Sequence, residues 1–205
     1  IAGHTPTGMS LLVTGGPAFG ADVAAAFEGA DFTLLLVTIL IVAILLIVTY
    51  RSPVLWLVPL VAVGLADGLA GRLTAAAGAA WDLQFDAGII SVLVFGAGTN
   101  HALLLISRYR EELQSIENHR QALSTAWRKT VPAILASNVT VVLALLTLVL
   151  AVIPGTHGLG ISSAIGLLIA LGAVLFLLPP LLAVCGRKVF WPFVPKPGDT
   201  RGRGG

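Results

Sequence analysis

The chain has 205 residues, of which 57% are hydrophobic and only 11% are charged. Soluble domains carry about 25% charged residues, so this composition excludes an ordinary soluble domain and indicates an integral membrane protein. The net charge of +2 gives no reason to expect a nucleic-acid partner, and the single cysteine, Cys185, excludes an internal disulfide bond.

The first 31 residues are too polar to cross a bilayer. Residues 9–14 suit a short strand, residues 15–17 (GGP) form a turn signal, and residues 18–30 are rich in alanine and suit a helix. We therefore expect residues 1–31 to be the end of an extracytoplasmic, porter-like α/β subdomain. The chain starts with Ile, and we expect it to be a piece of a longer protein.

Five apolar stretches follow, and each is long enough to cross the hydrocarbon core of a bilayer as a helix. They predict an all-α membrane domain over residues 32–186, with a basic cytoplasmic tail over residues 187–205. The expected spans cover about residues 33–50, 54–71, 88–107, 131–152 and 159–184.

The segments between the spans are interpreted as connectors. Residues 72–86 contain Trp81, which suits a membrane interface. Within residues 108–130, Asn118 is expected to cap a second, short helix that lies on the membrane surface or packs on the bundle. Pro179 and Pro180 are expected to kink the end of the last span.

The basic residues predict an orientation, because Lys and Arg cluster in the cytoplasmic loops of membrane proteins. With five crossings, all but one of the 12 basic residues fall on one side, the exception being Arg72. This pattern predicts that the N-terminal segment lies outside the cell and that the C-terminus is cytoplasmic.

Polar residues within the third and fourth spans predict a candidate site. Counting about 1.5 Å per residue from their cytoplasmic ends places Asn100 and Asn138 at about the same depth. We therefore predict one polar cluster that joins the two helices. Simple helix–helix adhesion explains such a cluster as well as a transport pathway does. Its members are Asn100, His101, Ser137, Asn138 and Thr140.

Asp67 is the one carboxylate well inside a predicted span, which makes it a candidate intramembrane acid. Snorkelling to the surface or pairing with Arg72 is favoured over a role in ion movement. Cys185 is interpreted as a packing residue in preference to an acylation site. No metal-ligand spacing and no serine–base pair is found on facing spans, so we expect no enzyme, no cofactor and no metal site.

One segment resembles a known family. The sequence GAGTNHALLLISRYREEL (residues 96–113) resembles the fourth transmembrane helix of MMPL transporters in the RND superfamily, whose pattern reads GAGTDYALLLISRYREEL. Four further segments resemble the same family, from the first periplasmic subdomain to the segment after helix six. These are VTGGPAFGADVAAAF, TYRSPVLWLVPLVAVGLAD, VPAILASNVTVVLALLTL and RKVFWPFVP.

The resemblance implies that the five spans correspond to helices two to six of the first transporter half, in a bacterial plasma membrane. Family members export lipids or other hydrophobic molecules and use the proton gradient. The resemblance therefore implies membrane lipids, a hydrophobic substrate, and the missing second half or further copies of the chain as partners.

The chain departs from the family pattern where that pattern carries the proton. The Asp-Tyr pair of the family is replaced by Asn100 and His101, and Asn138 replaces a small residue after the serine of helix five. Because Asn does not titrate, the carboxylate relay is absent from this half, and His101 is the hypothetical substitute. The alternative is a non-transporting membrane scaffold or a degenerate transporter fragment.

Overall fold

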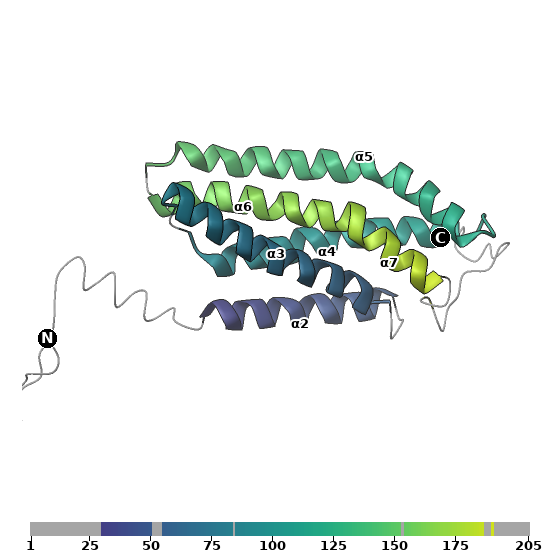
Figure 1. The fold of residues 1–205 in the computed structure, drawn as a ribbon. Helices are drawn as coiled ribbons and strands as arrows, with labels where there is room; N and C mark the ends of the chain where they lie inside the picture. Colours follow the sequence, from purple (N-terminus) through teal and green to yellow (C-terminus); the bar gives the residue numbers. More distant parts are fainter. Residues whose placement is uncertain (1–29, 51–54, 84, 153, 187–189, 191–205) are drawn as a thin grey trace, which may run out of the picture.

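The computed structural model describes residues 30–50, 55–83, 85–152, 154–186 and 190, and within them every regular element is a helix (Figure 1). This confirms the predicted all-α membrane domain. The predicted strand, turn and alanine-rich helix before Ala30, and nearly all of the basic tail, lie outside the described residues. The elements are α2 (Ala30–Tyr50), α3 (Leu57–Trp81), α4 (Ala87–Glu112), α5 (His119–Leu146), η2 (Thr147–Leu150), α6 (Pro154–Gly172), η3 (Ala173–Leu177) and α7 (Leu178–Cys185).

Four of the described helical stretches are long and apolar enough to cross a membrane, and Thr33–Val48 in α2 forms a shorter apolar helix. The outward faces of these helices are aliphatic: Leu40, Ile44 and Val48 of α2 are all more than half exposed. Such faces are unfavourable in water but suit a hydrocarbon environment. The four long stretches are Leu57–Trp81, Ala87–Glu112, His119–Leu150 and Gly155–Cys185.

The helix α4 lies at the centre of the bundle, where it contacts α2, α3, α5 and α6 (Figure 1). Small residues allow this close packing. A Cβ added to Gly98 of α4 would lie 3.1 Å from a Val63 methyl group, and one added to Gly166 of α6 would lie 3.0 Å from Ile90 and Val94. The helices therefore approach through their glycines, as small residues permit in membrane bundles.

Two helices are longer than the sequence predicted. The predicted connector after Gly71 is helical as far as Trp81, because alanine has the highest helix propensity and this stretch is rich in it. α3 then ends at Asp82, which adopts a left-handed conformation with φ of 50°. The predicted short helix after Asn118 is also not separate, since α5 continues from His119 through Pro132.

The predicted cap of α5 is confirmed. The side-chain oxygen of Asn118 accepts hydrogen bonds from the backbone N–H groups of Arg120, at 3.0 Å, and Gln121, at 3.4 Å. These are two of the N–H groups that a helix start leaves without partners. The asparagine therefore fixes the position at which α5 begins.

The last span changes its helix geometry before the two prolines. The segment η3 is a π-helix, and α7 follows it with Pro179 and Pro180 at its start. The Leu175 carbonyl would pair with the N–H of residue 179 in an α-helix or of residue 180 in a π-helix, and proline supplies neither. Instead, the Trp127 indole N–H donates to this carbonyl at 3.0 Å.

Candidate functional site

Two of the five predicted site residues are buried inside the bundle. His101 of α4 is 4% exposed, and its Nδ1 atom has no hydrogen-bond partner among the described residues. Asn138 of α5 is 1% exposed and donates through Nδ2 to the Leu167 carbonyl of α6 at 3.3 Å. The Asn138 carbonyl oxygen has no partner in the described chain. Both residues therefore keep unused hydrogen-bonding capacity in the protein interior, which is uncommon.

The other three predicted residues lie on outward faces. Asn100, Ser137 and Thr140 are all exposed in this chain. The Thr140 hydroxyl donates to the Ala136 carbonyl of its own helix at 2.8 Å, so its hydrogen-bonding need is met locally. The structure therefore does not bring the five residues together as one cluster, and their roles in transport stay predictions.

Asn138 bonds to Leu167 of α6, which lies between Gly166 and Ala170. Gly166 faces Ile90 and Val94 of α4, and Ala170 faces Gly98 of α4. His101 follows Gly98 by three residues, or about 5 Å along the helix axis. The predicted equal depth of Asn100 and Asn138 stays a prediction.

Asp67 faces the bundle and does not pair with Arg72 within the described chain. Its carboxylate interacts with the hydroxyl of Ser91 on α4. Ser162 and Ser163 of α6 lie about one turn before Gly166, which faces Ile90 and Val94 on either side of Ser91. They are 0% and 1% exposed, and the Ser162 hydroxyl has no partner in the described residues. Intramembrane carboxylates are costly unless they face protein or water. Asp67 therefore belongs to a second polar level, which the sequence alone did not predict.

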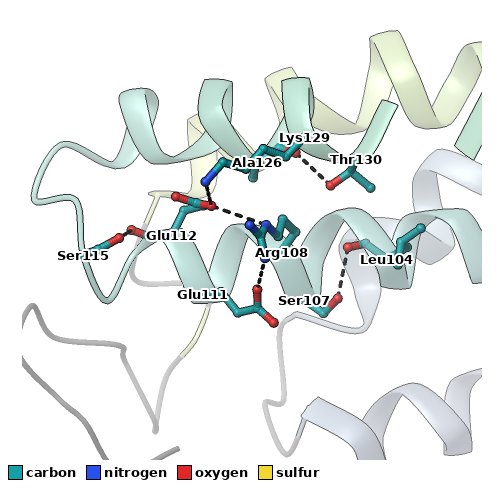
Figure 2. A network of polar contacts seen from close by, with 9 residues as sticks. All are labelled: Leu104, Ser107, Arg108, Glu111, Glu112, Ser115, Ala126, Lys129 and Thr130. Carbon is teal, nitrogen blue, oxygen red and sulfur yellow. Dashed lines mark hydrogen bonds and ion pairs between the residues drawn. The ribbon is translucent and has the colours of Figure 1, made fainter. Parts of the chain in front are cut away.

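A charged network joins α4 to α5 near the ends of the spans (Figure 2). One carboxylate oxygen of Glu112 accepts from Lys129 Nζ at 2.7 Å and lies 3.3 Å from Arg108 Nε. The Glu112 side chain is only 9% exposed, and Arg108 also pairs with Glu111 at 2.6 Å. The spacing of Arg108 and Glu112 by four residues could have predicted one of these pairs. The pair with Lys129 depends on how two helices meet.

The geometry defines a class of protein. Apolar helices long enough to cross a membrane surround a central helix, and polar groups with unused hydrogen-bonding capacity lie between them. Within the described residues, no group of three or more His, Cys, Asp or Glu side chains is placed to hold a metal ion. The chain is a multi-span helical membrane protein with polar groups inside its bundle.

The comparisons with known proteins give the family. The model of the MMPL family matches residues 1–203, and the chain belongs to this family. It is 46% identical to the Streptomyces coelicolor membrane protein ActII-3, over 96% of this chain and 29% of that protein. It is 39% identical to the apo-petrobactin exporter of Bacillus anthracis, over 92% and 26% of the two chains.

A third relative is more distant. The chain is 32% identical to the probable transport protein MmpL9 of Mycobacterium tuberculosis, over 89% of this chain and 19% of that protein. The chain thus spans less than a third of the length of each of these three relatives. Its relatives include proteins named for transport, which agrees with the family inferred from residues 96–113.

Proposed function

We propose that this chain forms the membrane domain of one half of an exporter that moves lipids or other hydrophobic molecules out of a bacterial cell. The observation that carries the proposal is the buried, incompletely paired His101 on the central helix α4. The names of the exporter and transport relatives support it. Whole relatives are more than three times as long, so the complete activity requires more than this chain.

In this proposal His101 carries the proton in place of the missing carboxylate. Imidazole is the side chain that gains and loses a proton near neutral pH. The burial of His101 on α4 limits its access to water. A proton carrier that is coupled to transport requires such limited access. Asp67, with its contact to Ser91, is a second titratable group inside one of the predicted spans. Polar and ionisable groups inside membrane bundles commonly mark such pathways.

The rest of the transporter is proposed to cover one exposed face of α4. Residues at intervals of three or four along this face are exposed, and several of them are polar or small. An asparagine facing lipid would be costly, so contact with protein is favoured. The partner is the second transporter half or a further copy of the chain. The face comprises Gly96, Asn100, Leu104, Ser107 and Glu111.

The location proposed is the plasma membrane, with the N-terminal segment outside and the C-terminus in the cytoplasm. This orientation places Arg108, Lys129 and Arg120 at the cytoplasmic surface, as the distribution of basic residues favours. The charged network of Figure 2 then lies at the inner membrane boundary.

Proton flux in proteoliposomes tests the proposal. The complete protein that contains this chain is reconstituted, a pH gradient is imposed, and internal pH is followed with a pH-sensitive dye. We expect the wild type to dissipate the gradient and His101→Gln to abolish most of that flux, while Ser137→Ala, at an outward position, keeps it. Asn100→Asp is expected to restore flux to the His101→Gln protein.

Two results would contradict parts of this proposal. Equal flux in the wild type and in the His101→Gln protein would exclude His101 as the carrier. If the wild type and the Asn100→Asp variant both moved no protons, the non-transporting scaffold would be the better description. A correctly folded sample is verified by gel filtration of each variant before reconstitution.

A further inference from the structure

A groove separate from the polar groups of the bundle lies between the start of α5 and α7. Its volume is about 450 Å³, and it is open to the outside of the chain. Apolar side chains form most of its wall, including Leu123, Pro179 and Ala183. Its polar groups are Arg120, Ser124 and the Trp127 indole. A groove with an apolar wall and a few polar groups at one end fits an amphipathic molecule.

The wall of the groove is held in place by hydrogen bonding. The Trp127 indole N–H donates to the Leu175 carbonyl, which lies 48 residues further along the chain. This bond orients the aromatic ring, and Pro179 and Pro180 add rigid surface opposite α5. The site is therefore largely preformed, which lowers the entropic cost of binding.

Arg120 gives the groove an unbalanced positive charge. The guanidinium is exposed, and the structure gives it no ion pair with any described residue. A neighbouring groove beside Arg108 and Lys129 differs, because Glu111 and Glu112 neutralise its two cations. The groove beside Arg120 therefore has a positive charge, unpaired within the described chain, that can bind an anion.

The groove also lies at the right depth for a lipid headgroup. The helical stretch His119–Leu150 has 32 residues, or about 48 Å, whereas the hydrocarbon core is about 30 Å thick. Because the charged residues of this stretch lie before Val131, the part that extends beyond the hydrocarbon core is the start of α5. This part of α5 bends toward α7 in Figure 1. Tryptophan is itself enriched at the headgroup level of membranes.

We propose that this groove binds one anionic phospholipid of the surrounding bilayer. The phosphate would lie against Arg120 and Ser124, and an acyl chain would follow Leu123 and Ala183 toward the hydrocarbon. Basic pockets between transmembrane helices are known to take anionic headgroups. The bound lipid would bridge α5 and α7 next to the π-helical segment, and so stabilise the change of helix geometry in the last span.

Native mass spectrometry of the complete protein tests this proposal. The protein is released from micelles that contain equal amounts of phosphatidylglycerol and phosphatidylcholine. We expect a bound phosphatidylglycerol in preference to phosphatidylcholine, and about five-fold less of it in Arg120→Gln, as one arginine near a lipid surface contributes. Arg128→Gln is the matched control: this arginine is exposed on the same helix but does not line the groove.

Several outcomes would overturn the proposal. One is equal phosphatidylglycerol binding by the wild type and Arg120→Gln, and another is an equal loss in Arg128→Gln. Inorganic phosphate alone, added without lipid, is expected to give no adduct. Ala183→Phe fills the groove and keeps Arg120, so it should also reduce lipid binding. This second variant decides the question if Arg120→Gln fails to fold.

Discussion

The hydrogen bond between Trp127 and Leu175 can be tested by removing a single N–H group. In Trp127→Phe the aromatic ring remains, but the Leu175 carbonyl loses its donor. Neither helix geometry can replace that donor, since residues 179 and 180 are both proline. A buried carbonyl without a partner costs about 1–3 kcal/mol. Trp127 is only partly buried beside an open groove, so we expect the lower end, about 1 kcal/mol.

The assay is reversible unfolding of the protein in mixed micelles with increasing fractions of SDS. Trp81→Phe is the control, because Trp81 is 63% exposed at the end of α3. A double-mutant cycle with Pro179→Ala makes the test specific, since residue 179 then supplies an N–H to Leu175. We expect Trp127→Phe to cost markedly less in that background. An equal cost in both backgrounds, or no cost beyond that of Trp81→Phe, would refute the reasoning.

Two further substitutions test the packing and the charged network, both by the same unfolding assay. Gly160→Ala places a Cβ 2.8 Å from a backbone carbonyl oxygen of α5, and we expect it to lower the free energy of unfolding by about 1–3 kcal/mol. Gly64→Ala is the control, because its added Cβ meets nothing within 4 Å and should not lower the stability. Glu112→Gln weakens its pair with Lys129, which is half exposed, so we expect about 1 kcal/mol that shrinks at high salt. Glu111→Gln, at 61% exposure, should change stability far less, and equal effects of the two would contradict the network.

Composition and hydropathy alone predict the class of protein and the number of apolar stretches. The bilayer imposes a fixed thickness, so a run of apolar residues reports a span without knowledge of its neighbours. The Asn118 cap was likewise predictable, because it involves only the next three residues. The predicted end of α3, at about residue 71, was wrong because the prediction followed hydropathy. The high helix propensity of the alanines after it extends the helix to Trp81.

The side of each helix that faces the interior depends on how the helices pack against one another. Asn100 and His101 are adjacent in sequence, yet His101 is buried and Asn100 is exposed. The rotation of α4 that separates them is set by close contacts at Gly98 with α3 and α6. The partners of Trp127 and Glu112 lie 48 and 17 residues away. Hydropathy indicates where a helix crosses the membrane, but packing between helices decides its rotation, and with it which side chains can meet in a site.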